Sequence, residues 1–540
     1  MPSTFGVIDL FAGPGGLGEG FAALEVDSHQ PFRIGISVEK EESARKTLRL
    51  RAFLREYRRQ HGKLPDEYIA FHAGEISEPD WAQIDEAAWR LACSEARQLE
   101  LGSEETAKEI DLAIERIRSE HKETVLIGGP PCQAYSLVGR ARSKGKKDYV
   151  PEKDERHFLF REYIRVLDKL RPAIFVMENV KGMLSSTVQS QRVFEMLMED
   201  LSSLGHAGEE LYQLRAFRLD KDAIRLKEVD DPSEFIVRAE QFGVPQKRHR
   251  VIIIGIRSDI ADRADAISIP LPTPARVTVS ETIGDMPRLR SGLSPSKLDN
   301  PKQWKSVVKK AAGQLSKVSK RSGADTIGDR FKHISADLME KARNERSDHE
   351  LPKAYGNSNI PLLQWLENRE LRSLVQHETR GHMQSDLGRY LFVSTFGEVN
   401  GRSPKASEFP EELAPNHRSW STGKFADRFR VQLAHEPATT ITSHISKDGH
   451  YFIHPDPLQC RSLTVREAAR LQTFPDDYLF LGNRTQQYVQ VGNAVPPYLA
   501  RQIARLLHKV LQQSNEAPER TKEDLELAGR RLFSRPYFRG

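Results

Sequence analysis

The chain contains few cysteines and no long hydrophobic run. Its 540 residues include three cysteines, Cys93, Cys132 and Cys460, which lie far apart and form no CxxC pair. This spacing argues against a disulfide framework and a structural zinc site, so we expect no metal. No segment has the unbroken apolar length of a membrane span. The chain starts without a basic leader or an apolar signal region, which predicts a cytoplasmic protein with no membrane partner.

The chain also has little net charge. Its 81 basic and 76 acidic residues give a formal charge of +5, which by itself does not indicate nucleic-acid binding. The distribution is more informative, because one stretch has basic residues and no Asp or Glu: Lys302, Lys305, Lys309, Lys310, Lys317, Lys320 and Arg321. Such a run is usually a solvated face. Beside a nucleic-acid enzyme core, it would suit contacts with phosphates.

The first half of the chain alternates strand and helix patterns. A chain of this length predicts two or more domains. Apolar, β-branched runs predict strands at 5–11, 34–38, 124–127, 173–177 and 251–256, with helical patterns between them. This alternation predicts an α/β fold with a doubly wound, mostly parallel sheet.

The pattern changes after about residue 260. A proline-rich segment at 270–274 marks a boundary, and the following residues are polar, basic and poor in clear periodicity until 464–471. We therefore expect a first domain at 1–275, with an insertion of one or two amphipathic helices near 80–121. A second, smaller domain is expected at 276–484, a return to the first domain at 485–515, and a charged tail at 516–540.

A stiffly mounted cysteine follows the strand pattern at 124–127. The residues after it are Gly128-Gly129-Pro130-Pro131-Cys132. The prolines restrict the backbone just before the thiol, which suits a nucleophile at the carboxyl end of a strand. A lone cysteine is more often a core residue, so this motif alone leaves both interpretations open.

A glycine loop follows the first predicted strand. Gly13, Gly15 and Gly18 match GxGxxG, and Glu39 ends the second predicted strand, where an acid that binds ribose hydroxyls is expected. The glycines let the backbone approach an adenosyl ligand closely. The loop therefore indicates an adenosyl cofactor, and a nicotinamide enzyme remains an alternative at this point.

Two further segments carry polar residues near predicted strand ends. Glu178 follows the strand at 173–177, where a glutamate is most often solvated or a cap. Gln246, Arg248 and Arg250 alternate and so share one side of an extended segment. They form an exposed edge ladder or, if aimed at the mouth of the sheet, bind an anionic or carbonyl-rich substrate.

Taken together and in this order, these segments resemble the cytosine-5 DNA methyltransferase family of the bacterial restriction-modification type. The resemblance covers the glycine loop, Pro130–Gln133, Glu178–Val180, Gln246-x-Arg248-x-Arg250, Arg466–Asp476 and Gln490–Pro496. It implies a Rossmann-like fold with a smaller target-recognition domain, and S-adenosylmethionine as the cofactor. The implied substrate is a cytosine flipped out of a specific double-stranded DNA sequence.

The resemblance assigns catalytic roles residue by residue. It makes Cys132 the nucleophile that attacks ring carbon 6, and Glu178 the acid at ring nitrogen 3. Arg250 holds the base carbonyl, and Arg248 supports the site. The cofactor positions it implies are Phe11, Gly13, Gly15, Glu39, Pro131, Leu159, Asn493 and Val495. The family usually has a Gly-Asp pair near the third strand, whose acid meets the adenine amino group, and here Glu75 follows Gly74 and is the implied cofactor residue at that position.

The resemblance also predicts the DNA contacts. The basic loop from Ala134 to His157 is expected to close over flipped DNA, and the DNA-binding positions are Ser136, Arg140, Arg142, Arg156 and Gln246. Residues between about 276 and 460 are expected to read the DNA sequence. The enzyme is expected to be a monomer associated with the nucleoid, and the resemblance admits a cognate restriction endonuclease as a partner.

Three other functions fit parts of the sequence. A transfer-RNA methyltransferase on the same scaffold carries Cys-Phe-Thr in its recognition region, and this chain has no such tripeptide. A catalytically silent DNA-binding homologue is expected to lack Cys132, Glu178 or Arg250, and all three are present. A nicotinamide dehydrogenase would not explain Cys132, Arg248 and Arg250 together.

Overall fold

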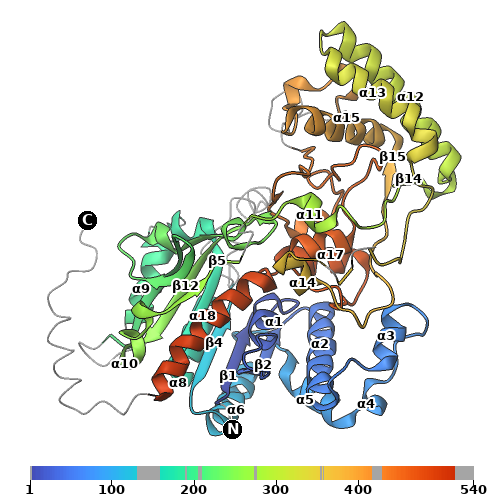
Figure 1. Ribbon diagram of the computed structural model, residues 1–540. Helices are drawn as coiled ribbons and strands as arrows, with labels where there is room; N and C mark the ends of the chain where they lie inside the picture. The colour runs from blue at the N-terminus through green and yellow to red at the C-terminus, as the bar shows by residue number, and fades with distance from the viewer. Residues whose placement is uncertain are drawn as a thin grey trace.

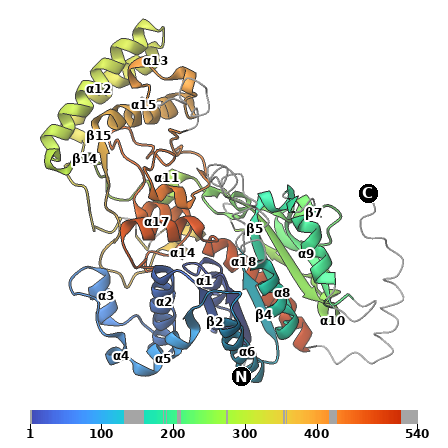
Figure 2. The same ribbon diagram turned by 180° about the vertical axis from the view of Figure 1, so that it is seen from behind.

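The structure is a computed structural model that describes most of the chain. The described residues are 3–130, 159–185, 187–188, 191–202, 204, 210–272, 276–352, 355–356, 358–415 and 428–516. Figures 1 and 2 show a lower body built on a large sheet and an upper body of helices, joined by a waist of short elements. No helix in the described ranges is long and apolar enough to cross a membrane.

A ten-stranded sheet forms the lower body, in the order β13-β9-β8-β12-β5-β4-β1-β2-β3, with β10 beside β12. Its strands are β1 (Phe5–Leu10), β2 (Phe32–Glu39), β3 (Ala96–Gln98), β4 (Thr124–Gly128), β5 (Ile174–Val180), β8 (Tyr212–Asp220), β9 (Ala223–Lys227), β10 (Ile236–Arg238), β12 (His249–Arg257) and β13 (Ser268–Pro270). The predicted α/β class is confirmed.

The sheet has a parallel half and an antiparallel half. The strands from β5 through β4, β1 and β2 to β3 are parallel, whereas β12 is antiparallel to both β5 and β8. The chain passes from β1 to β2 on one side and later to β4 on the other. Such a switch point leaves a crevice outside the carboxyl ends of the strands, where α/β proteins bind their ligands.

Helices cover both faces of the sheet (Figures 1 and 2). Those of the lower body are α1 (Gly16–Ala22), α2 (Glu42–His61), α3 (Asp66–His72), α4 (Trp81–Ile84), α5 (Glu86–Glu95), α6 (Glu104–Glu120), α8 (Leu159–Leu170), α9 (Val193–Ser202), α10 (Ser258–Ala261) and α18 (Pro497–Glu516). Phe21 of α1 and Ile503 of α18 belong to one apolar core, while Ile117 of α6 and Leu167 of α8 belong to a second. Helix α18, although late in the chain, thus packs in the first body.

The segment predicted as a helical insertion contains a strand of the main sheet. The pattern at 80–121 predicts helices alone, but β3 lies within it and pairs in parallel with β2. A three-residue strand is too short to show an alternating pattern. The additional helical layer starts earlier, at α2, and has its own small core around Phe53, Tyr68 and Trp81.

The upper body is helical, contrary to the expectation of weak periodicity. Its long helices are α12 (Pro301–Arg321), α13 (Asp325–Lys341) and α15 (Gln384–Asn400). Trp304, Val308, Ala312 and Leu315 are buried along one side of α12, at the spacing of a helix face. Lysines and serines fill the other positions and lower the overall hydrophobicity, which hides this periodicity in the sequence.

Short elements connect the two bodies or lie at their borders. They are α11 (Val279–Ile283), α14 (Pro361–Leu366), α16 (Val465–Leu471), α17 (Arg484–Asn493), and the two-stranded pairs β11 (Gln246–Lys247) with β16 (Ala438–Thr439), β14 (Gly292–Ser294) with β15 (Gly381–Met383), and β6 (Thr187–Val188) with β7 (Gln191–Arg192). An apolar cluster that includes Ile441, Leu471 and Val491 forms the core of the waist.

Candidate active site

The candidate site lies at the carboxyl edge of the parallel strands. The glycine loop follows β1, Glu39 ends β2, Gly129 and Pro130 follow β4, and Glu178 lies near the end of β5. Because β12 is antiparallel, it begins at this same edge, and Arg250 is its second residue. Residues distant in the sequence are therefore brought together here by strand order alone.

Glu39 ties the glycine loop to β2. Its carboxylate accepts hydrogen bonds from the backbone N–H of Gly13 at 2.8 Å and of Glu41 at 2.8 Å. Burial raises the pKa of Glu39, an effect that these two hydrogen bonds oppose. Phe11 (φ 58°), Gly13 (φ 58°) and Gly15 (φ 94°) adopt left-handed backbone conformations, so the loop needs its glycines at two of these three positions.

The loop is also held from the waist. The Tyr478 hydroxyl donates a hydrogen bond to the Pro14 carbonyl oxygen. A Cβ atom at Gly16 would lie 2.2 Å from the Val495 carbonyl oxygen, so only glycine permits this approach of α1 to the segment after α17. Val495 is thus placed against the glycine loop, and Asn493, exposed at the end of α17, is two residues away.

These surroundings fit an adenosyl ligand. Among the described residues, apart from the chain neighbours of Gly13, no atom lies within 4 Å of a Cβ built at that glycine, so the turn of the loop is open. Phe11 and Leu159 are partly buried apolar side chains that pack on the same core, where they can border a ring. Glu39 keeps lone pairs that can accept ribose hydroxyls. We therefore assign this loop as the place where a cofactor can bind.

Glu75 is not part of this arrangement. The third strand at this edge is β3, and Gly74-Glu75 follows helix α3 instead, so the basis for selecting Glu75 is wrong. Its carboxylate lies 3.6 Å from an Arg372 guanidinium nitrogen, in an exposed ion pair. Next to β3, the Leu99 N–H donates a 3.1 Å hydrogen bond to the Glu39 carbonyl, and Glu100 pairs with Lys40.

Glu178 and Arg250 form an ion pair at the centre of the edge. Glu178 Oε1 lies 2.9 Å from Arg250 Nε, and the two side chains are only 14% and 16% exposed. The antiparallel register of β5 and β12 sets the pair, because Val180 lies opposite Arg250. A Cβ atom at Gly129 would lie 3.0 Å from Glu178 Oε2, so the acid directly adjoins the turn after β4.

Asn179 fixes the turn that leads to Cys132, a role the sequence reasoning missed. Its side-chain amide donates to the Pro130 carbonyl at 3.1 Å, while its oxygen accepts the Val180 N–H at 2.8 Å. The position of Asn179 directly after Glu178 was the available signal. An amide that both donates and accepts can clamp two backbone segments, which neither Glu178 nor Val180 could do.

Arg248 and Gln246 lie inside the protein. Arg248 is 2% exposed and donates to the carbonyls of Ile441 at 2.8 Å and Gly492 at 3.4 Å. Burial lowers its pKa. Gln246 is 0% exposed; its amide group donates to Gln472 and Leu471 and accepts the Ile441 N–H at 2.8 Å.

These contacts change the expected role of the alternating segment. Arg248 joins the segment before β12 to the waist, which agrees with the supporting role expected of it. Its guanidinium lies in the interior of the protein. The structure does not support the DNA contact expected of Gln246, because the described protein already uses its amide. Alternation predicted a shared face but did not show that two of the three side chains lie in the interior.

Six predicted site residues lie outside the described residues. They are Pro131, Cys132, Ser136, Arg140, Arg142 and Arg156. Their roles remain predictions. The described residues on either side of this segment, Pro130 and Leu159, both border the edge that carries Glu178 and Glu39.

The fold and site place a glycine loop that can hold a cofactor beside a paired acid and guanidinium. Residues 98–509 match the family model of the C-5 cytosine-specific DNA methylases. This match covers most of the chain, and the chain belongs to that family. The protein is therefore a DNA (cytosine-5-)-methyltransferase, which acts on DNA and requires a methyl donor.

Curated relatives agree with this assignment. The Type II methyltransferase M.Bpa9945I of Bacillus paralicheniformis is 32% identical over 94% of this chain and 99% of the relative. The Type II methyltransferase M1.HphI of Haemophilus parahaemolyticus is 27% identical over 72% of this chain and 69% of the relative. A solved structure of the Entamoeba histolytica methyltransferase EhMeth, at 13% identity and a TM-score of 0.41, covers 94% of this chain and 99% of that one. The assignment rests on the sequence matches.

Proposed function

We propose that this protein is the modification enzyme of a type II restriction-modification system. It methylates carbon 5 of a flipped-out cytosine in a specific double-stranded DNA sequence, with S-adenosylmethionine as methyl donor. The Type II methyltransferases among its relatives support the biological setting. Within this proposal the protein acts as a monomer on chromosomal DNA, and a cognate endonuclease cuts the unmodified sequence.

The observation that carries the proposal is the Glu178–Arg250 pair beside Gly129. Cytosine carbon 5 is a weak nucleophile, so the ring must first gain electron density. On adjacent strands, a guanidinium can donate to the base carbonyl, and an acid, once protonated, can donate to the neighbouring ring nitrogen. Both side chains are largely buried, at 14% and 16% exposed, which strengthens their electrostatic interactions.

We assign each step to a residue of the chain. The Cys132 thiolate adds to ring carbon 6, and Glu178 donates a proton to ring nitrogen 3, which leaves carbon 5 electron-rich. Arg250 hydrogen-bonds the base carbonyl through this step. After methylation the carbon 5 proton passes to solvent water and the thiolate leaves by elimination, while ring nitrogen 3 returns its proton to Glu178. S-adenosylmethionine supplies the activated methyl group when it is bound.

The remaining residues position these groups. Asn179 fixes the turn before Cys132 through the Pro130 carbonyl. Phe11, Gly13, Gly15, Glu39, Leu159, Asn493 and Val495, with Pro131, are proposed to hold the cofactor. Residues 276–484 are proposed to recognise the DNA sequence, and Ser136, Arg140, Arg142 and Arg156 to contact DNA at the flipped base. A stacked cytosine is unreachable, so flipping costs a few kcal/mol of lost pairing and stacking.

The position of the methylated base tests the proposal. The purified full-length protein is incubated with labelled S-adenosylmethionine and either unmodified bacterial genomic DNA or bulk transfer RNA. We expect label in DNA alone, as 5-methylcytosine within one short sequence. Label confined to transfer RNA, or on an exocyclic amino nitrogen, would overturn the proposal.

A further inference from the structure

The outer edge of the upper body carries a stripe of cations along α12. Lys309 and Lys320 follow Lys302 after seven and eighteen residues, close to whole numbers of helical turns, so these three share one line along the helix. Lys310, Lys317 and Arg321 flank this line within about a third of the circumference. All six are exposed, and α12 contains no Asp or Glu.

The opposite side of α12 is anchored in the core. Trp304, Val308 and Phe331 belong to the cluster that joins α12, α13 and α15. The Trp304 indole donates a 2.8 Å hydrogen bond to the Ser291 hydroxyl. The direction of the cationic stripe is therefore set by packing, and the helix cannot rotate to hide it.

Nearby acids leave most of the stripe uncompensated. On α13, Asp329 pairs with Lys320 at 2.6 Å and Asp337 with Lys341 at 3.1 Å. On α15, Glu398 pairs with Arg330 at 2.9 Å. Across the part of the chain that the structure describes, no ion pair involves Lys302, Lys309, Lys310, Lys317 or Arg321.

This arrangement costs stability. Like charges four residues apart on a helix repel one another, as at Lys305–Lys309 and Lys317–Arg321. Lys302 also lies in the first turn, where the helix dipole disfavours a cation. A cationic stripe along one helix is the electrostatic footprint of a polyanion partner.

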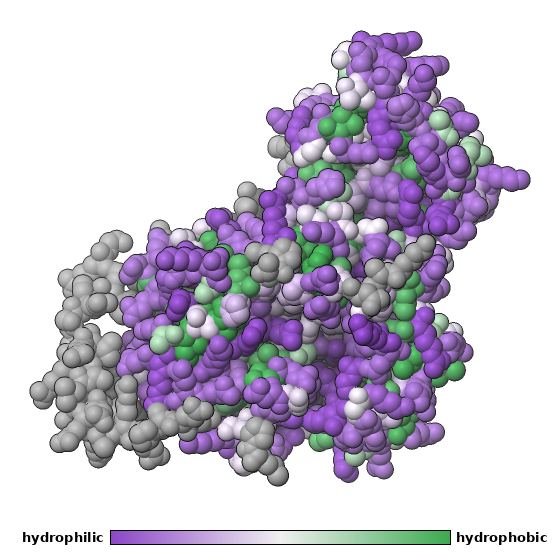
Figure 3. Space-filling model, viewed as in Figure 1, coloured by the Kyte–Doolittle hydropathy of each residue, from purple (hydrophilic) through white to green (hydrophobic). Residues whose placement is uncertain are grey.

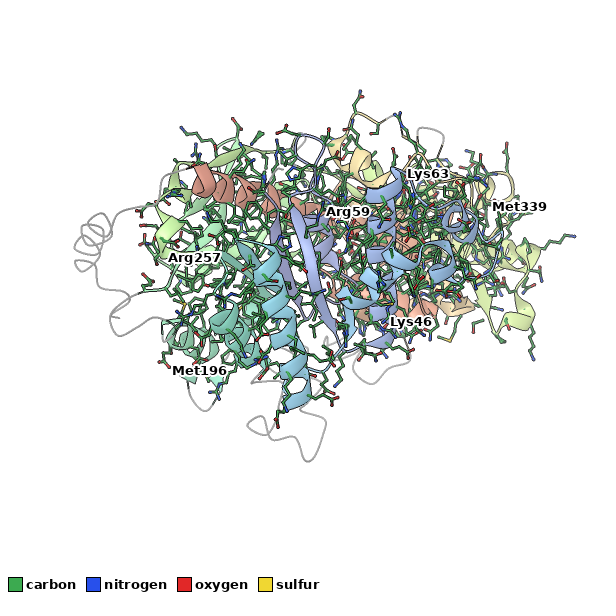
Figure 4. All side chains as sticks on the ribbon, turned by 90° about the horizontal axis from the view of Figure 1, so that it is seen from below. Lys46, Arg59, Lys63, Met196, Arg257 and Met339 are labelled. Atoms are coloured by element: carbon green, nitrogen blue, oxygen red, sulfur yellow. The ribbon has the colours of Figure 1, made fainter. Side chains whose placement is uncertain are left out.

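The stripe is accessible. Gly313 lies within it, and a Cβ built there meets no atom within 4 Å from the described residues outside its own turn of the helix. Figures 1 and 2 both place α12 and α13 at the outer edge of the upper body, away from the sheet. That edge is largely hydrophilic in Figure 3, and Figure 4 shows Met339 of α13 at the opposite end of the molecule from Arg257 and Met196.

We propose that the cationic stripe of α12 binds the phosphates of double-stranded DNA outside the target sequence. The stripe, which is remote from the candidate active site, would hold the enzyme on DNA of any sequence. The partner is DNA because the family's substrate is DNA, so the inference rests on the proposed function. Lysines reach single phosphates as point charges and read no base.

Binding to DNA without cytosine isolates this contact. The probe is a 60-base-pair duplex of adenine and thymine only, which offers no target base, and its affinity is measured across a salt series. The variant K302Q/K309Q/K317Q removes three stripe charges. The control K63Q/K108Q/K227Q removes three exposed lysines elsewhere, which are 55%, 73% and 48% exposed. Lys63 lies in the lower body, before α3 (Figure 4).

We expect the stripe variant to bind about tenfold more weakly at low salt. The slope of log affinity against log salt should become shallower by about 0.9 for each phosphate that the variant no longer neutralises. The control should stay within about twofold. G313E, at an open helical position, adds an acid to the stripe and should also weaken binding, whereas G313A should not. Thermal melting checks that every variant is folded.

Two results would overturn the inference. One is that the stripe and control variants bind the DNA duplex with equal affinity and equal salt slope. The other is that wild type binds a 60-base-pair RNA duplex more tightly than the DNA duplex and loses this preference in the stripe variant. Methylation of genomic DNA by wild type is measured in parallel. If wild type methylates DNA and the stripe variant binds like the control, the inference fails and the proposed function stands; absence of 5-methylcytosine contradicts the proposed function instead.

Discussion

At the scale of single residues, the ion pair between Glu178 and Arg250 is the most consequential contact of the site. The Glu178 carboxylate pairs with Arg250 in a setting that is 14% exposed. Under the proposed mechanism Glu178 also delivers a proton to the base, so it must exchange Arg250 for the substrate as its partner when DNA binds. The pair therefore describes the resting state, in which Arg250 holds the acid in place beside Gly129.

Glu178→Gln should lower kcat by roughly 100-fold or more, because an amide cannot deliver the proton that stabilises the adduct. Glu240→Gln is the matched control. Glu240 pairs with His249 at 2.8 Å on the neighbouring segment, so this change also removes one carboxylate beside β12. Steady-state methylation of DNA measures both variants. A Glu178→Gln enzyme with wild-type kcat would exclude Glu178 as the acid.

At the scale of elements, the glycine loop depends on a waist segment more than 460 residues away in the chain. Tyr478 donates to the Pro14 carbonyl, and Arg51 lies 5.0 Å from the centre of the Tyr478 ring while pairing with Glu19 of α1 at 2.6 Å. Arg51 also lies 3.2 Å from Asp477. The conformation of the cofactor loop is therefore tied to the segment that joins the two bodies.

Tyr478→Phe should raise the KM for the methyl donor about fivefold while leaving kcat within about twofold. The change leaves the buried Pro14 carbonyl unpaired, at a cost of about 1–3 kcal/mol. Tyr488→Phe is the control, since the Tyr488 hydroxyl donates a 2.7 Å hydrogen bond to the Leu463 carbonyl, away from the loop. If Tyr478→Phe and Tyr488→Phe have the same KM for the methyl donor, the Tyr478 hydroxyl only stabilises the fold.

The elements also show what the sequence could predict. Long apolar runs such as Val251–Ile256 predicted strands correctly, because a strand that is buried on both faces consists almost entirely of apolar residues. Strand direction could not be predicted, since β12 and β5 look alike in composition. β3 was missed because three residues are too few to show an alternating pattern. α12 was missed because its six lysines outnumber its four buried apolar residues, Trp304, Val308, Ala312 and Leu315.

The site was predicted less evenly than the fold. Glu178, Arg250, Glu39 and the glycine loop were selected because each follows or begins a strand, and the structure brings them to one edge. Gln246 lies in the interior and Glu75 on a different element, because burial and strand order depend on residues more than 200 positions away. Motif spacing holds no information on such contacts.

At the scale of the whole molecule, buried histidines at the waist link stability to pH. His377 lies between the Thr464 hydroxyl at 3.0 Å and the Pro287 carbonyl at 2.8 Å. Burial lowers its pKa to about 4, and burial also lowers that of His72 to about 4. These neutral rings join segments of the waist, so protonation opposes the assembly of the two bodies.

The free energy of unfolding should fall as the pH drops from about 6.5 towards 4. In this range the unfolded chain binds protons at these histidines and the folded protein does not, so stability is complete above pH 6.5 and is lost on acidification. His377→Gln should reduce the loss by up to about 3 kcal/mol. Denaturant unfolding at several pH values measures this loss of stability. His333→Gln, at an exposed position of α13, is the control. An unchanged slope in His377→Gln would contradict this account.

Covalent capture of DNA at Cys132 tests the central claim most directly. In DNA that carries 5-fluorocytosine, the fluorine at carbon 5 cannot leave as a proton, so elimination is blocked and the enzyme stays attached. We predict a denaturant-stable complex with wild type in the presence of S-adenosylmethionine, mapped by mass spectrometry to the peptide that contains Cys132, and no complex with Cys132→Ala. Wild type that methylates ordinary DNA without forming this complex, or a complex that persists in Cys132→Ala, would contradict the account.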